Sequence, residues 1–135
     1  MRLFISVVSH GHSSIIKKLA TLSKLARLQS VKIILRDNVG EDSLRNYCKS
    51  HNIFYVKNDE TIGFAKNNNL NFSLILEKYN VNKKDFFLIL NPDIYISKEN
   101  FNKFSLFLNN TQLNLISILQ FSDMANQKIE PSARY

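Results

Sequence analysis

Phe86-Phe87-Leu88-Ile89-Leu90-Asn91-Pro92-Asp93 is an apolar run that ends in a polar turn. The apolar part predicts a buried strand, and the carboxyl ends of parallel strands are where open α/β sheets collect their ligands. Asp93 offers a carboxylate and Asn91 an amide oxygen, on a turn that Pro92 stiffens, and hard divalent cations prefer such oxygen ligands. The stretch predicts a cation site at a sheet edge. The alternative is an ordinary type I turn, which also favours Asn followed by Pro.

Outward from this stretch, short apolar runs alternate with helical patterns. Strands are expected at 3–8, 31–35, 53–56, 85–90 and 115–119, and helices at 15–25, 41–51, 63–79 and 97–108. Ser13 or Ser14 is expected to cap the first helix and Ser97 the last. The apolar residues of 63–79 nearly encircle that helix, which predicts deep burial. The alternation indicates βαβ units, and so an α/β fold with a mostly parallel sheet.

Composition and charge limit the partners. The chain has 135 residues, enough for one domain with a real core. Its net charge of +7 favours anionic partners such as a nucleotide diphosphate or an anionic membrane surface. No basic run reaches the length of a nucleic-acid-binding tail, so no nucleic acid partner is expected. Asparagine is very frequent, and each Asn cluster is therefore discounted as partly compositional.

The cysteine content and the hydropathy indicate the compartment. Cys48 is the single cysteine, which excludes an internal disulfide and fits a reducing compartment. Its helical spacing from Leu44 predicts a buried structural thiol. No apolar stretch approaches the length of a membrane span, and the apolar start of the chain is too short for a secretory signal. These features predict a cytoplasmic protein that could touch the inner face of the membrane.

Two further polar segments follow predicted strands. In Arg36-Asp37-Asn38, a carboxylate at a strand end could accept a hydrogen bond from the ring N–H of a pyrimidine, or the segment is a solvated turn. In Ser9-His10-Gly11-His12, short polar groups could touch a base or ribose, or simply hold a loop. The two histidines lack a third metal ligand in matching context.

The segment 63–69 opens the third predicted helix. Gly63 permits close backbone approach, and a helix start presents free N–H groups to a phosphate or a base carbonyl. Asn68 and its neighbours could donate or accept hydrogen bonds there. The segment is neither a dinucleotide fingerprint nor a P-loop. No Ser lies in a nucleophile elbow and Cys48 has no placed partner, so nucleophilic catalysis gains no support.

Taken together in this order, these segments resemble the family-2 glycosyltransferases of the GT-A fold. Within them the chain is most similar to bacterial rhamnosyltransferases that extend polyprenyl-diphosphate-linked glycans in lipopolysaccharide O-antigen assembly. The segment 129–134 is similar to the one that follows the sugar-binding sheet. The resemblance implies nucleotide contacts for Ser9, His10, Asp37, Gly63, Asn68 and Asn91. It also implies that Asn91 and Asp93 replace the family's Asp-x-Asp motif and hold Mg²⁺ or Mn²⁺.

The resemblance also implies a reaction. A sugar, L-rhamnose from dTDP-rhamnose or another dTDP- or UDP-sugar, would pass with inversion to a polyprenyl-diphosphate-linked glycan acceptor. Thr61 and Ser9-His10-Gly11 depart from the family pattern near the base and ribose. Family members run to about twice this length, and their second half carries the general base that an acceptor hydroxyl requires. Asp123 and Glu130 do not match it. Residues 1–135 are therefore expected to be the donor-binding portion, truncated before the acceptor half and poor in turnover.

Two other functions stay open. The chain could be a catalytically silent nucleotide-binding module that keeps the fold without the chemistry. A nucleotidyltransferase shares a similar sheet but needs a glycine-rich, basic phosphate loop near the first strand. The segment 9–14 does not supply one convincingly.

Overall fold

A four-stranded parallel sheet in the order β3-β2-β1-β4 is the centre of the fold. The structure is a computed structural model that describes residues 1–114, 116, 120–121 and 129–130. The chain forms two compact units, Met1–Asn102 and Lys103–Tyr135. The sheet belongs to the first unit, and its strands are β1 (Leu3–Ser9), β2 (Val31–Asp37), β3 (Phe54–Lys57) and β4 (Phe86–Ile89).

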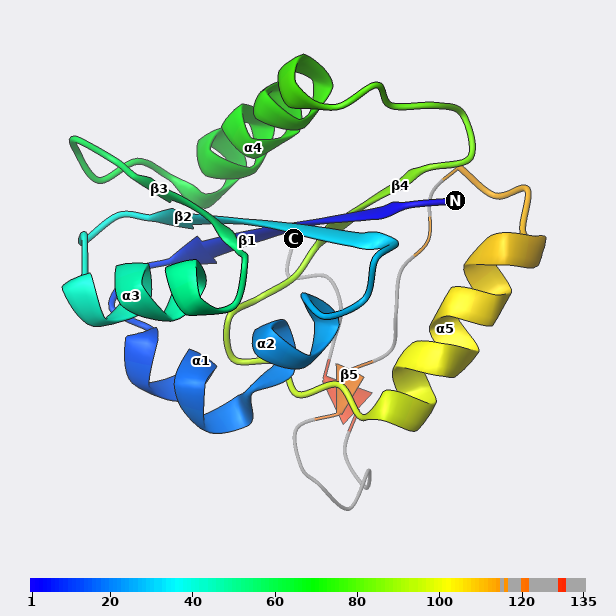
Figure 1. Cartoon of the computed structure of the whole chain (residues 1–135), viewed down its shortest axis with the longest axis horizontal. Coiled ribbons are helices and arrows are strands. Elements are labelled where there is room, and N and C mark those ends of the chain that lie inside the picture. The colour runs from blue at the N-terminus through cyan, green and yellow to red at the C-terminus, as the bar shows by residue number, and fades with distance from the viewer. Residues whose placement is uncertain (115, 117–119, 122–128, 131–135) are drawn as a thin grey trace. The chain divides into compact units, whose positions relative to one another are not determined.

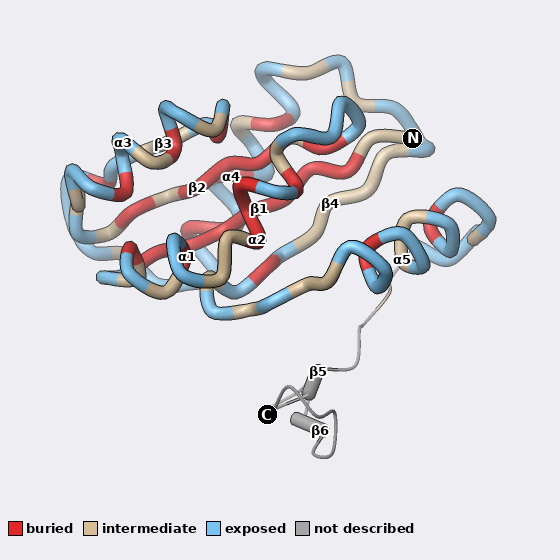
Figure 2. The backbone as a smooth tube through the Cα atoms, turned by 60° about the horizontal axis from the view of Figure 1, so that its bottom comes forward, coloured by how far each residue is buried: buried red, intermediate tan, exposed pale blue. Residues whose placement is uncertain are grey.

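Helices cover both faces of the sheet. One face carries α1 (Ser13–Leu19), α2 (Thr21–Leu25) and α3 (Asp42–Ser50), and the other carries α4 (Phe64–Lys78) (Figure 1). Because neither face of the central strands meets water, all seven residues of β1 are buried, as Figure 2 shows. The α/β fold with a mostly parallel sheet, predicted from the alternation of patterns, is confirmed. The predicted bounds of β3 and β4 differ by one residue at each end.

The core of the α4 face is a cluster of apolar side chains from three elements. Phe4 of β1, Ile34 of β2 and Ile75 of α4 are each 1% exposed or less. On the opposite face, Leu35 of β2 and Leu44 of α3 have no exposed surface. Burying a large aliphatic or aromatic side chain contributes roughly 1.5–3 kcal/mol, so these two layers fix the helices on the sheet.

The strand register brings the carboxyl ends of three strands to one level. Ser9 pairs with Asp37 across β1 and β2, and Asp37 pairs with Lys57 across β2 and β3. β2 thus runs two residues beyond the predicted end at Leu35 and includes the Arg36-Asp37 segment. After β4, the amide of Leu90 still donates to the Ser6 carbonyl at 2.9 Å. The segments that follow all four strands therefore leave the same edge of the sheet.

The first predicted helix is divided in two. Ala20 adopts a left-handed conformation with φ 54°, ending α1 and preceding α2. A left-handed residue cannot continue a helix, and its amide closes α1 on the Ile16 carbonyl at 3.1 Å. The predicted serine cap is also wrong, because the N-cap residue is His12. The Ser13 hydroxyl instead meets the Ser43 hydroxyl at 2.6 Å.

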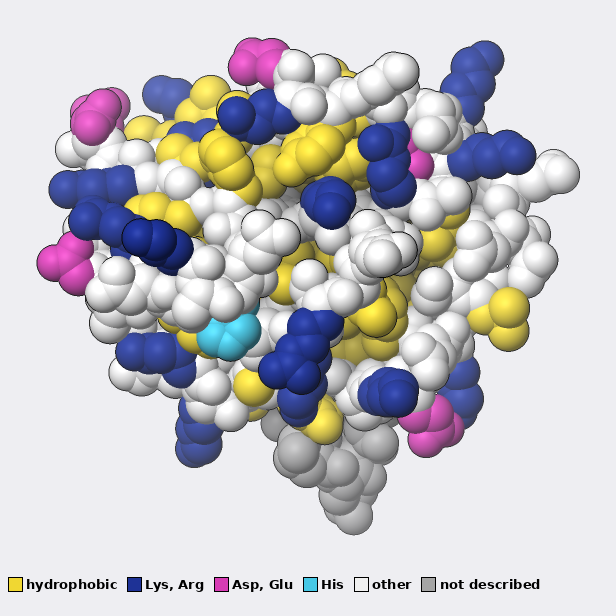
Figure 3. Space-filling model, in the orientation of Figure 1, with side chains coloured by type: hydrophobic (Ala, Val, Ile, Leu, Met, Phe, Trp, Pro, Cys, Tyr) yellow, Lys and Arg dark blue, Asp and Glu magenta, His cyan; other side chains and the backbone are white. Residues whose placement is uncertain are grey.

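α4 is not deeply buried all round, which corrects the prediction. Its buried residues are Asn67, Asn68, Asn71 and Ile75. Leu70, Phe72 and Leu76 are 39%, 43% and 52% exposed, and hydrophobic side chains lie at the surface around α4 in Figure 3. The physical reason is that the buried asparagines find hydrogen-bond partners, Asn68 and Asn71 on the sheet and Asn67 in the loops beside it. Their burial therefore carries only a small desolvation penalty and does not oppose this orientation of the helix.

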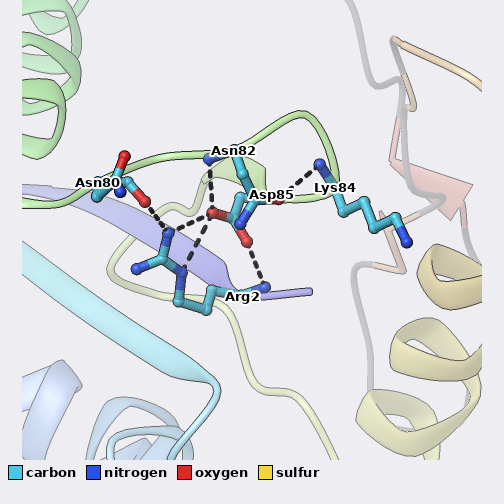
Figure 4. A network of polar contacts seen from close by, with 5 residues as sticks. All are labelled: Arg2, Asn80, Asn82, Lys84 and Asp85. Atoms are coloured by element: carbon cyan, nitrogen blue, oxygen red, sulfur yellow. Dashed lines mark hydrogen bonds and ion pairs between the residues drawn. The ribbon is translucent and has the colours of Figure 1, made fainter.

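An ion pair joins the start of β1 to the start of β4. The Arg2 guanidinium contacts the Asp85 carboxylate at 2.6 Å, and the Arg2 amide donates to the same carboxylate at 2.7 Å (Figure 4). Asn82 donates to Asp85 as well, at 3.1 Å, and Arg2 reaches the Asn80 carbonyl. This network ties the loop before β4 to the central strand, at the sheet edge opposite the one where the strands end.

α5 (Lys98–Asn110) begins where predicted, because the Ser97 hydroxyl accepts a hydrogen bond from the Asn100 amide at 3.1 Å. The second unit contains an antiparallel pair, β5 (Gln120–Phe121) and β6 (Ile129–Glu130). The predicted strand at 115–119 lies outside the described residues except for Ile116, as does most of the segment 129–134. Among the helices of the described residues, none has the length and apolar character that a membrane crossing requires.

Candidate functional site

A cavity of about 440 Å³ lies at the carboxyl edge of the sheet, within the first unit. Its walls come from the segments that follow β1, β2 and β4 and from the segment before α4. The lining residues are Val8, His10, His12, Asn38, Thr61, Ile62, Phe64, Asn91, Pro92 and Asp93. Three segments that are far apart in the sequence, each singled out for its polar residues, therefore meet around one space.

The turn after β4 places the predicted metal ligands at this cavity. The Ile94 amide donates to the Asn91 carbonyl at 3.3 Å and closes the turn. Cation binding by Asn91 and Asp93 stays a prediction. Asn91 and Asp93 are both exposed. In the described part of the chain, no hydrogen bond or ion pair occupies the Asp93 carboxylate.

These two oxygen groups suit a hard cation in kind. Mg²⁺ is usually held by one or two carboxylates together with water and substrate phosphates, so a protein site with a single free carboxylate is sufficient. No cluster of three or more His, Cys, Asp or Glu side chains is placed to hold a metal ion among the described residues. A cation here would need oxygens of a bound ligand to complete its coordination.

His10 and His12 also line the cavity, on the segment that follows β1. The His10 amide donates to Nδ1 of His12 at 2.8 Å, and the His12 amide donates to the Ser9 hydroxyl at 3.2 Å. Ser9 is fully buried and does not line the cavity, so it holds the loop. Gly11, with φ 77°, supplies the left-handed turn between the histidines.

Asp37 is fully buried at the end of β2. Its carboxylate accepts hydrogen bonds from the amides of Val39 at 3.0 Å and Glu41 at 2.8 Å, and from the Tyr55 hydroxyl at 2.8 Å. Burial alone would raise the pKa of Asp37, but these donors outweigh it and hold the pKa below its ordinary value. Asp37 does not line the cavity. Its contact with a base stays a prediction, while its observed role is to hold the loop 38–41.

Gly63 and Asn68 do not line the cavity, although Gly63 is exposed and Asn68 is buried. Gly63 is the N-cap residue of α4, and Asn68 is buried with its amide nitrogen on the Phe64 carbonyl at 2.9 Å. Between them, Phe64 lines the cavity and is 51% exposed. Ile62 adds a second apolar wall residue just before the helix.

A network of buried amides supports this wall, and the sequence did not reveal it. It consists of Ser6, Arg36 and five asparagines, Asn38, Asn58, Asn67, Asn68 and Asn71. Arg36 donates through Nε to Asn71 at 3.0 Å and through Nη1 to Asn58 at 3.1 Å. Ser6 joins Asn68 and Asn71, at 2.6 and 2.8 Å. The signal available in the sequence was the spacing of Asn67 and Asn71, which lie four residues apart on one helix face. It was not used, because the frequent asparagines were attributed partly to composition.

Comparison with solved structures identifies the fold class. The chain superposes on the S. aureus protein TarS with a TM-score of 0.63 at 16% identity, over 91% of this chain and 40% of a TarS structure of residues 1–349. A second TarS structure gives a TM-score of 0.61 at 17% identity, over 81% of this chain and 20% of that one. The parallel sheet with helices on both faces is therefore a GT-A-like fold.

Sequence comparison identifies the relatives. The chain is 31% identical to the rhamnosyltransferase WbbL of Escherichia coli K12 over 97% of its own length and 49% of that protein. It is 27% identical to the low-salt glycan biosynthesis hexosyltransferase Agl10 of Haloferax volcanii over 64% of this chain and 27% of that protein. No family model matches.

These findings make the chain a homologue of glycosyltransferases. It is a homologue of the N-terminal portion of the rhamnosyltransferase WbbL and spans about half the length of that curated relative.

Proposed function

We propose that this chain binds the nucleotide-sugar donor of a glycosyltransferase in the cavity at the carboxyl edge of its sheet. The observation that carries the proposal is the convergence of His10, Asn38, Phe64, Asn91 and Asp93 on one space. The donor is dTDP-rhamnose by similarity to a rhamnosyltransferase, with a UDP-sugar as the alternative. The net charge of +7 favours this dianionic ligand.

The reaction of the whole protein would be an inverting sugar transfer. An acceptor hydroxyl attacks the anomeric carbon, the bond to the diphosphate breaks, and the configuration inverts. The acceptor would be a polyprenyl-diphosphate-linked glycan of the O-antigen type, reached at the cytoplasmic face of an anionic membrane. We assign donor binding, and no general base, to the residues described here.

Asp93 and Asn91 would hold Mg²⁺ or Mn²⁺, which acts as a Lewis acid that neutralises the leaving diphosphate. The remaining work belongs to the cavity wall. Ile62 and Phe64 would exclude water from one side of the nucleotide, and the loop 38–41, held by Asp37, would close the other. His10 and His12 line the same cavity and would add N–H donors to the phosphates.

A thermal-melt panel of the purified chain tests this function. dTDP, UDP, GDP and ADP are each added with and without Mn²⁺, to the wild type and to Asp93→Ala. A ligand at a hundredfold excess over its dissociation constant stabilises the folded state by about 2.7 kcal/mol, which raises the melting temperature by several degrees. We expect this shift with dTDP or UDP only when metal is present, and its loss in Asp93→Ala. If no nucleotide shifts the melt, the proposal is wrong.

A silent nucleotide-binding module is the second candidate. It is favoured by the scarcity of metal ligands, since the described residues hold no cluster of three. It predicts that dTDP or UDP stabilises the chain equally with and without Mn²⁺, and that Asp93→Ala binds like the wild type. The same panel therefore separates the two functions.

A further inference from the structure

Asn38 occupies an unusual position, because it lines the cavity while its amide belongs to the buried network. Its Oδ1 accepts from Nδ2 of Asn58 at 2.7 Å, from the Ile62 amide at 3.3 Å and from Nδ2 of Asn67 at 3.4 Å. Its Nδ2 donates to the Ile62 carbonyl at 3.1 Å. The oxygen is fully used.

The nitrogen is not fully used. An amide nitrogen carries two hydrogens, and only one of them has a partner among the residues that the structure describes. Asn38 is half-buried, so part of it faces the cavity. The group that Asn38 can offer to a ligand is therefore an N–H donor rather than an acceptor.

Arg36 fixes the orientation of the Asn38 amide indirectly, through Asn58. A guanidinium only donates hydrogen bonds, so Asn58 must turn its oxygen toward Arg36, at 3.1 Å. Nδ2 of Asn58 then faces the oxygens of Asn38 and Asn67, at 2.7 Å each. Turning the Asn38 amide over would place its nitrogen against three donors, leaving buried polar groups unpaired.

We propose that Asn38 is the residue that reads the base of the nucleotide, by donating a hydrogen bond to a carbonyl oxygen, and that Arg36 positions it through Asn58. The proposal rests on the proposed donor-binding function. Uracil and thymine carry a carbonyl oxygen where cytosine carries an amino group. A fixed donor in the wall meets an acceptor on the first two bases and a second donor on the third.

The selectivity would therefore come from Asn38 rather than from the buried Asp37. The carboxylate of Asp37 already serves three protein donors, and it stands outside the cavity wall. Asn38, the next residue in the sequence, is half-buried in that wall and has one N–H without a partner among the described residues. The adjacent positions thus divide the work, since Asp37 holds the loop and Asn38 contacts the ligand.

Calorimetric titration of UDP and CDP, at one fixed Mn²⁺ concentration, tests the proposal through the ratio of the two dissociation constants. A lower fraction of folded protein changes both dissociation constants by the same factor. Their ratio can therefore be measured even in a partly destabilised variant. The wild type should bind UDP at least about tenfold more tightly than CDP, since an unpaired or opposed donor costs a factor of this order. Asn38→Asp replaces the donor by an acceptor and should bring the ratio to about one or below.

Two variants of Arg36 test the positioning. Arg36→Lys keeps a group that only donates and should preserve most of the UDP preference. Arg36→Gln can donate or accept, so Asn58 and Asn38 are free to turn, and the preference should fall toward one. A purely structural role for Arg36 would change the melting temperature in both variants and the ratio in neither.

Asn69→Asp is the matched control for charge, because Asn69 is an exposed residue of α4 outside the cavity wall. It should leave the ratio unchanged. An unchanged ratio in Asn38→Asp, or equal weakening of both nucleotides, would overturn the inference while leaving donor binding intact. If the wild type binds neither UDP nor CDP nor dTDP, the proposed function fails first, and this inference fails with it.

Discussion

Individual side chains in this protein are placed by the hydrogen bonds that their immediate neighbours can supply. Asp37 shows this most clearly. A fully buried carboxylate is expensive unless donors surround it, and the turn after β2 provides two amides while β3 provides the Tyr55 hydroxyl. Burial, together with the same contact, raises the pKa of Tyr55 to about 12. An acidic residue after a strand was visible in the sequence, but its saturation by protein donors was not.

Cys48 gives a prediction at the same scale. It has no exposed surface, and burial together with the nearby charge of Asp37 raises the pKa of its thiol to about 12. The thiolate is the reactive form, so at pH 8 the native thiol should be labelled by iodoacetamide on the order of a hundredfold more slowly than in unfolding concentrations of urea. Mass spectrometry of timed samples measures the two rates. Equal rates would show that α3 does not bury the thiol.

At the scale of elements, the ion pair between Arg2, before β1, and Asp85, before β4, makes the free energy of unfolding depend on pH at acidic pH. Burial alone would raise the pKa of Asp85, but the hydrogen bonds from Arg2 and Asn82 outweigh it and bring the pKa to about 2. A carboxylate whose pKa is depressed in the folded state stabilises it above the unfolded value near 4. That contribution is lost as the pH falls from about 4 to about 2.

Asp85→Asn should therefore lower the free energy of unfolding by about 2 kcal/mol at pH 6, and the difference from wild type should shrink toward pH 2. Urea titrations at several pH values measure this. Asp42→Asn is the matched control. Asp42 also forms an ion pair, with Arg45, but its side chain is 83% exposed. Such exposed pairs contribute little. A pH-independent difference for Asp85→Asn would contradict the assignment.

α4 provides a second prediction at this scale. Ile75 is 1% exposed and belongs to the core cluster, whereas its sequence neighbour Leu76 is 52% exposed. Ile75→Ala should cost about 2–5 kcal/mol of unfolding free energy, and Leu76→Ala should stay within about 0.5 kcal/mol. Chemical denaturation of both variants measures the contrast. Comparable losses would mean that the helix is rotated relative to the orientation described.

The contrast within α4 also explains where sequence interpretation succeeded and failed. The alternation of apolar runs and helical patterns sets the parallel sheet, because strand burial depends on simple periodicity. The orientation of α4 depends instead on whether Asn68 and Asn71 find partners on β1 and β2, which are distant in sequence. The left-handed Ala20 is similar, since no glycine or proline marks that break.

At the scale of the whole molecule, the predicted segments converge because the register brings three strand ends to one level. His10, Asn91 and Asp93 were predicted and line the cavity. Asn38, Ile62 and Phe64 line it too, and were not chosen as site residues, because exposure beside a cavity follows from packing rather than from residue type. Ser9, Asp37 and Asn68 are buried behind the wall, where they hold the residues that line it, and Gly63 is exposed outside the lining.

The central claim is that the cavity binds a nucleotide diphosphate through a metal held by the turn after β4. Isothermal titration of the chain with dTDP, in buffer with Mn²⁺ and then with chelator, tests it most directly. We predict saturable binding with Mn²⁺, at least a tenfold weaker affinity with chelator, and the chelator-like affinity in Asp93→Asn whether or not metal is present. Absence of binding, or binding that neither chelator nor Asp93→Asn weakens, would contradict the account.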